Sequence, residues 1–80
     1  MTPDEAYQLV REELIRIVPD ADLDAIPPDA DLCEALELDS LDFQAFVVQL
    51  SERTAHRIEE DDYDRLFTMA SCIDFLTTHG

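Results

Sequence analysis

The spacing of apolar residues is the feature that most limits how this chain can fold. In the N-terminal segment the apolar residues recur every three or four positions, as Tyr7, Val10, Leu14, Ile17 and Val18. Near the C-terminus the same pattern occurs at i, i+3, i+4 and i+7, in Met69, Cys72, Ile73 and Leu76. This period is typical of amphipathic helices, and no segment alternates apolar and polar residues as a half-buried strand does. The spacing therefore predicts an all-α fold.

Capping signals predict where the first two helices begin and end. Residues 2–5, Thr-Pro-Asp-Glu, place a capping residue, a proline at the first helical position and a glutamate that closes a capping box. Pro19 marks the end of that first helix. Asp39 is suited to cap a second helix, with Asp42 in its first turn, that runs to about residue 54 or 55. No glycine marks the end of this second helix, because the only glycine is Gly80.

A long connection separates these two helices, from about residue 20 to residue 39, and contains Pro27 and Pro28. A loop of this length in a small domain is commonly functional, and its apolar residues must hold it against the core. We expect a short helical turn at residues 31–36. A short third helix at residues 59–66 and a fourth helix capped by Thr68 complete the pattern. The predicted architecture is a small four-helix bundle, with three longer helices and one short one, forming one domain over residues 1–80.

The charge of the chain is strongly one-sided. Twenty acidic residues face five arginines, for a net charge of −15, and no basic residue lies between Ile17 and Glu52. Such a field repels nucleic acid and anionic lipid and favours basic patches on partner proteins, although an acidic surface that only keeps the protein soluble is an open alternative. No segment approaches the roughly 20 apolar residues of a membrane span, and the first residues do not resemble a signal peptide. We therefore expect a cytoplasmic monomer without nucleic-acid binding or membrane insertion.

The sequence predicts no active site or metal site of its own. Cys33 and Cys72 lack metal-ligand spacing, and we expect them to pack as small buried apolar residues. His56 and His79 have no partner pattern of a catalytic triad. The acidic run at residues 20–24 lacks the glycine and the distal glutamate of a calcium loop. The protein is therefore predicted not to be an enzyme.

The second helix carries two apolar stripes. We assign the first stripe to the core: Phe43, Phe46, Val47 and Leu50. The second stripe is offset around the helix and consists of Leu41, Ala45 and Val48. Two stripes exceed what one core face requires, so the second either belongs to a widely buried central helix or forms a partner-binding surface ringed by acids.

Ser40 occupies the predicted start of this helix. Its role is either to help cap the helix, which Asp39 fills equally well, or to hold a chemical group. Free backbone N–H groups and the helix dipole favour an anion such as a phosphate at this position.

The segment Asp39-Ser40-Leu41-Asp42 resembles the phosphopantetheine attachment motif of acyl carrier proteins. The resemblance extends over nearly the whole chain, through the capped first helix, the long acidic loop and the acids before the short third helix. It implies that Ser40 bears a covalent 4′-phosphopantetheine group. It also implies that Asp39 and Asp42 face the modifying transferase and that Leu41 and Val48 contact partner enzymes.

This resemblance implies a carrier that catalyses nothing itself. It holds acyl intermediates as thioesters and delivers them to enzymes of fatty-acid, polyketide or specialised lipid biosynthesis. The implied partners are a phosphopantetheinyl transferase, acting with magnesium, and acyl-loading or acyl-processing enzymes of the ligase, ketosynthase or acyltransferase type. Two alternatives stay open: a carrier of aminoacyl or aryl groups, of the peptidyl or D-alanyl type, and an acidic helical interaction domain without a prosthetic group.

Three departures from the family favour a dedicated pathway over bulk fatty-acid synthesis. Glu37 stands three residues before the serine, where the family usually has glycine, so we expect the turn there to be built differently. Ala45 replaces an acidic residue of the fatty-acid type. Phe43 and Phe46 are bulky for positions near the acyl cavity.

Overall fold

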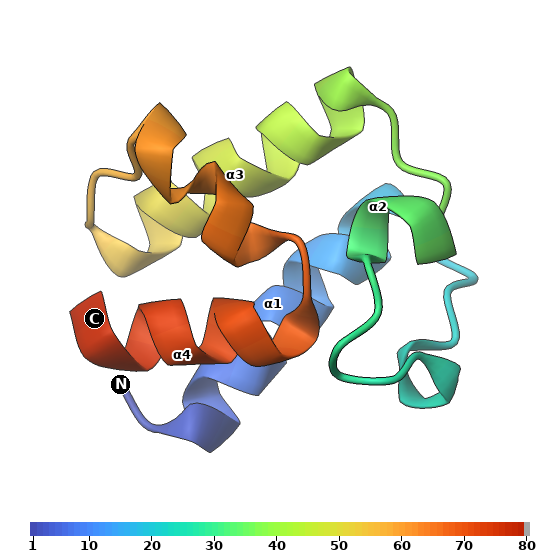
Figure 1. The fold of residues 1–80 in the computed structure, drawn as a ribbon, viewed down its shortest axis with the longest axis horizontal. Helices are drawn as coiled ribbons and strands as arrows, with labels where there is room; N and C mark the ends of the chain where they lie inside the picture. Colours follow the sequence, from blue (N-terminus) through green and yellow to red (C-terminus); the bar gives the residue numbers. More distant parts are fainter. Residues whose placement is uncertain (80) are drawn as a thin grey trace.

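The computed structural model describes residues 1–79, and all the regular secondary structure in that range is helical, with no strand. Figure 1 shows the chain order of its elements, which are α1 (Pro3–Ile17), η1 (Leu23–Ala25), α2 (Leu32–Ala35), α3 (Ser40–Thr54), η2 (Glu60–Leu66) and α4 (Met69–His79). The predicted all-α bundle is confirmed. The short third helix of the prediction is η2, a 3₁₀-helix, and the predicted turn in the long loop is α2.

Helix α1 begins with the predicted capping box. The Thr2 Oγ1 accepts a hydrogen bond from the Glu5 backbone N–H at 3.2 Å, and the Glu5 carboxylate accepts one from the Thr2 N–H at 3.0 Å. The backbone hydrogen bond from Thr2 lowers the pKa of Glu5. One face of the helix is buried against α4 and α3, through Ala6, Leu9, Val10 and Leu14. Of the predicted pattern, Val10 and Leu14 lie in this face, whereas Tyr7, Ile17 and Val18 are only half-buried.

A buried charge joins α1 to α3. Glu13 is only 1% exposed, and its carboxylate lies 3.2 Å from the Arg53 Nη1 and 4.0 Å from the Arg16 Nη1. The second Nη of Arg53 lies 3.2 Å from the Glu12 carboxylate. The hydrogen bond to Glu13 raises the pKa of Arg53. The helical pattern alone did not predict this pair, because nothing in the sequence distinguishes Glu13 from the exposed acidic residues.

Apolar residues hold the long loop against the bundle, as predicted. Leu23 and Leu32 are buried in the core. The Leu32 N–H donates to the Phe67 carbonyl at 2.7 Å, and the Ala70 N–H donates to the Pro28 carbonyl at 2.9 Å. In Figure 1 the loop with η1 and α2 lies at the end of the bundle away from the two chain termini. The loop therefore reaches α3 from a fixed position.

Two helix ends use left-handed backbone without glycine. Glu37, after α2, has φ 56°, and Ala55, after α3, has φ 53°. In each case an N–H bonds back to a carbonyl five residues earlier, Leu38 to Cys33 at 2.8 Å and His56 to Ser51 at 3.2 Å. The sequence suggested a differently built turn at residue 37. The backbone there instead adopts the conformation that favours glycine, with glutamate in its place.

Candidate functional site

Ser40 is the first residue of α3, and a reciprocal pair of hydrogen bonds fixes that helix start. The Asp42 N–H donates to the Asp39 carboxylate at 2.8 Å, and the Asp39 N–H donates to the Asp42 carboxylate at 3.4 Å. The predicted cap at Asp39 is confirmed, and it forms a complete capping box. Capping therefore does not require the Ser40 side chain.

The Ser40 hydroxyl is exposed, and within residues 1–79 no side chain or backbone group hydrogen-bonds to it. The first main-chain bond of the helix start runs from the Phe43 N–H to the Asp39 carbonyl at 3.0 Å. The Ser40 and Leu41 N–H groups precede that bond and have no place in the helical ladder. Two N–H groups at a helix N-terminus beside a free hydroxyl suit a phosphate ester on Ser40.

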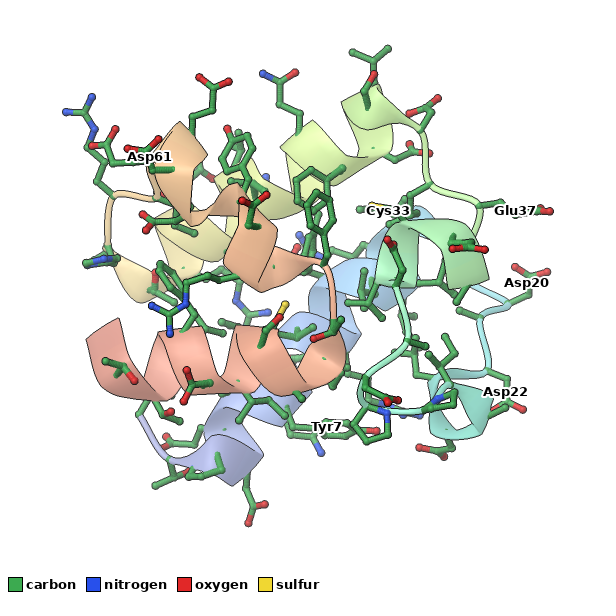
Figure 2. All side chains as sticks on the ribbon, in the orientation of Figure 1. Tyr7, Asp20, Asp22, Cys33, Glu37 and Asp61 are labelled. Atoms are coloured by element: carbon green, nitrogen blue, oxygen red, sulfur yellow. The ribbon has the colours of Figure 1, made fainter. Side chains whose placement is uncertain are left out.

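The charge around this hydroxyl is negative. Asp39 and Asp42 flank it, and acids continue over other parts of the surface. Figure 2 shows the exposed side chains of Asp20, Asp22, Glu37 and Asp61 projecting outward. A positively charged protein surface is attracted to such a region, whereas an anionic one is repelled. The site therefore suits approach by a basic partner.

An apolar groove of about 500 Å³ opens beside Ser40. It lies between the start of α3, the end of η2 and α2, where Figure 2 labels Cys33. The ring of Phe43 stacks on that of Phe67, with centroids 4.9 Å apart and planes 18° apart, and packs edge-to-face with Tyr63 at 5.7 Å. The full lining is Cys33, Leu38, Asp39, Ser40, Phe43, Gln44, Tyr63 and Phe67.

This groove changes the assignment of Phe43. The core stripe of α3 is confirmed for Phe46, Val47 and Leu50, which are buried, but Phe43 is only half-buried and forms a groove wall. The sequence reading did not single out Tyr63 and Phe67. Their spacing of four residues after an acidic run was the available signal, since it places two rings near each other.

The second apolar stripe of α3 is exposed to solvent. Leu41 is 73% exposed and Val48 is 46% exposed, and Ala45 is also exposed. Of the described residues, only Met1 is another large apolar residue exposed in this way. The alternative of a widely buried central helix is therefore wrong. The predicted strip begins directly after Ser40 and lies on the solvent side of the helix.

The two cysteines are free and differ in environment. Cys72 is buried, its thiol donates to the Leu66 carbonyl at 3.3 Å, and burial raises the pKa of that thiol to about 12. Cys33 is half-buried in the groove, so the expectation of burial is confirmed only for Cys72. Burial and the nearby Asp31 raise the pKa of Cys33. Both thiols are therefore poor nucleophiles at neutral pH.

Helix length bears on the membrane question. None of the helices in the described part of the chain is long and apolar enough to cross a membrane.

Comparison with known families agrees with this geometry. A family model described as the phosphopantetheine attachment site matches residues 8–76. Searches of curated proteins and of solved structures gave no match. Domains of this family bear 4′-phosphopantetheine, attached covalently to a serine. With the match covering most of its length, the chain belongs to the phosphopantetheine attachment-site family and is a carrier protein for that group.

Proposed function

We propose that this chain is an acyl carrier whose 4′-phosphopantetheine is attached to Ser40. The observation that carries the proposal is the exposed, unengaged Ser40 hydroxyl at a helix start that Asp39 and Asp42 already stabilise. The other two serines are engaged. Ser51 donates to the His56 carbonyl at 2.8 Å, and Ser71 exchanges hydrogen bonds with Thr68.

The attachment step replaces one phosphoester bond by another. The Ser40 oxygen attacks the coenzyme A phosphorus nearer to the pantetheine, and the pyrophosphate P–O bond breaks. Adenosine 3′,5′-bisphosphate leaves, and the hydroxyl proton passes to a base of the transferase. The chain's own part is to present the hydroxyl and to offer the Ser40 and Leu41 N–H groups to the phosphate oxygens. Magnesium brought with the transferase offsets the negative charge of Asp39, Asp42 and the phosphates.

The group supplies a thiol that holds the acyl cargo as a thioester. Tethering raises the local concentration of cargo at each partner, so weak docking is sufficient. Asp39 and Asp42 suit contact with the transferase, because they flank the hydroxyl. The exposed strip of Leu41, Ala45 and Val48 suits contact with acyl-loading and acyl-processing enzymes. The carrier needs no catalytic group of its own.

Two further expectations belong to this proposal. Free cysteines fit a reducing compartment, and we place the protein in the cytoplasm. The mostly apolar groove beside Ser40 favours acyl or aryl cargo over a charged aminoacyl group. The replacement of an acid by Ala45 favours a dedicated lipid or polyketide pathway.

Intact mass after incubation with coenzyme A, magnesium and a broad-range phosphopantetheinyl transferase tests the attachment. We expect one phosphopantetheine per chain, none in Ser40→Ala, and an unchanged helical circular dichroism spectrum for that variant. Ser51→Ala is the matched control and should be modified like the parent. Lack of modification with several transferases would favour the acidic interaction domain instead. Modification that persists in Ser40→Ala would move the site elsewhere.

A further inference from the structure

Aromatic rings form the walls of the groove beside Ser40, and their chemistry indicates which class of acyl group the groove prefers. We propose that this groove prefers a flat, neutral, unsaturated acyl group to a long saturated chain when the arm folds the cargo back onto it. This inference rests on the proposed attachment at Ser40 and deepens it by naming a cargo class.

The groove is within reach of any group tethered at this site, because Ser40 is itself one of its lining residues. A tethered cargo meets the groove at an effective concentration on the order of millimolar. Weak contacts with the walls are therefore enough to populate a folded-back state. The volume of about 500 Å³ lies within the range of roughly 300–1,000 Å³ that is usual for small-molecule sites.

The walls favour a planar group. Phe43 stacks on Phe67 with planes 18° apart, and Tyr63 meets Phe43 edge-on at 79°. Flat conjugated groups gain from offset stacking and edge-to-face contacts with such rings, beyond the burial of their area. A planar cargo that lies with one whole face against a wall also draws its thioester against the groove and away from water.

The limited depth of the groove beside Phe43 disfavours a long methylene chain. Behind Phe43 lies Phe46, which is 1% exposed, with the two ring centroids 6.3 Å apart. Phe46 does not line the groove, so the groove ends at Phe43 on this side and does not continue into the core. A saturated chain gains most where it is surrounded on all sides, and this open groove leaves one side in water.

The charge and the polar groups of the lining further limit which acyl groups suit the groove. Asp39 is the only charged residue in the lining, and it is negative, so a carboxylated acyl group is repelled. Tyr63 and Gln44 line the same groove and are not fully buried, and no hydrogen bond joins either side chain to another residue in the described range of 1–79. Both are available to a hydroxyl or carbonyl substituent on a neutral ring.

The test compares two cargoes of similar length, cinnamoyl and octanoyl, and adds malonyl as an anionic cargo. Each is loaded on Ser40 from its coenzyme A thioester by a broad-range transferase, and loading is confirmed by intact mass. The readout is the rate at which hydroxylamine cleaves each thioester, relative to the same thioester on free pantetheine. We expect at least threefold protection of cinnamoyl, and protection below twofold for octanoyl and malonyl. Amide chemical shifts of residues 43, 63 and 67 should move with cinnamoyl alone.

Phe43→Leu and Tyr63→Leu should each remove most of the cinnamoyl protection. Phe75→Leu is the matched control, because Phe75 is a core ring that does not line the groove. It loosens the bundle by the same chemical change and should keep the protection. Equal or greater protection of octanoyl, or loss of protection in Phe75→Leu alone, would overturn the cargo preference and leave the attachment at Ser40 standing. A chain that never loads would overturn the attachment, and the preference with it.

Discussion

Helices α1 and α3 are built alike at their starts, yet the candidate site lies on only one of them. Each has 15 residues, and each begins with a reciprocal capping box, through Thr2 and Glu5 in α1 and through Asp39 and Asp42 in α3. The first residue of α1 is Pro3, which has neither a hydroxyl nor an N–H group. The first residue of α3 is Ser40, which has both.

The surfaces next to the two starts also differ. Helix α1 buries its apolar side in the core, whereas α3 leaves Leu41 and Val48 exposed and borders an aromatic groove. A capped helix N-terminus is common in proteins and by itself indicates no function. The comparison teaches that such an end suits attachment when its first residue brings a free nucleophile and its neighbours stay open to a partner.

The largest expected effect concerns the pair that joins the two helices. Arg53→Met leaves the Glu13 carboxylate, only 1% exposed, without its closest cation. We expect a loss of about 3 kcal/mol in the free energy of unfolding, since removal of one partner strands a buried charge. Urea denaturation measures it.

Arg57→Met is the control for this pair. Arg57 is 86% exposed, and its partner Glu59 lies 2.9 Å away on the surface. We expect a loss of about 0–1 kcal/mol for an exposed ion pair. Equal losses in the two variants would show that Glu13 does not depend on Arg53.

The next effect concerns partner docking on α3. Burying Val48 in a partner pocket is worth about 1.5–3 kcal/mol, against roughly 0.2–1 kcal/mol for an exposed ion pair. We therefore expect Val48→Asp to reduce acyl transfer to a cognate enzyme at least tenfold, while Ser40 stays modifiable. Glu52→Gln on the same helix should matter little. If Glu52→Gln were the more damaging, docking would be ionic rather than apolar. The measurement is the rate of acyl transfer to the enzyme from each variant, with the fold of each variant checked by circular dichroism.

The two caps provide a smaller and more direct contrast. Thr2→Ala and Asp39→Ala each remove one capping acceptor, and each should cost about 1 kcal/mol of stability. Only Asp39→Ala should also slow attachment of phosphopantetheine, because its cap holds Ser40 in place. Asp39→Asn retains a capping side chain and should restore stability. Single-turnover modification, followed by mass, is the measurement, and equal rates for Thr2→Ala and Asp39→Ala would break the proposed distinction.

The features that the sequence predicted are local or periodic. The helix starts at Thr2 and Asp39 follow from side chains that bond within three residues, and the buried face of α1 follows from its period. The sequence left the strip of Leu41, Ala45 and Val48 either buried or free for a partner, and the structure rules out the buried outcome. The groove could not be predicted, because it depends on Phe43, Tyr63 and Phe67 meeting across two elements. The Glu13–Arg53 pair joins residues 40 positions apart, and no periodic pattern reports such a contact.

The smallest effect concerns how the two helices end. Ala55 closes α3 at φ 53°, whereas Val18 closes α1 at φ −127°. A left-handed residue with a Cβ costs about 1–2 kcal/mol, and a glycine there recovers about half of that after its own entropy cost of about 0.5–1 kcal/mol. Ala55→Gly should therefore raise stability by about 0.5–1 kcal/mol. Val18→Gly should lower stability, because its conformation needs no glycine and its partly buried side chain is lost. Urea midpoints with an unchanged m-value measure both. Because Ala55 lies at the far end of α3 from Ser40, the rate of attachment should stay the same in Ala55→Gly. A stabilised variant with slower attachment would mean that the two ends of α3 are coupled, and that the open helix start is less independent of the bundle than its exposed hydroxyl suggests.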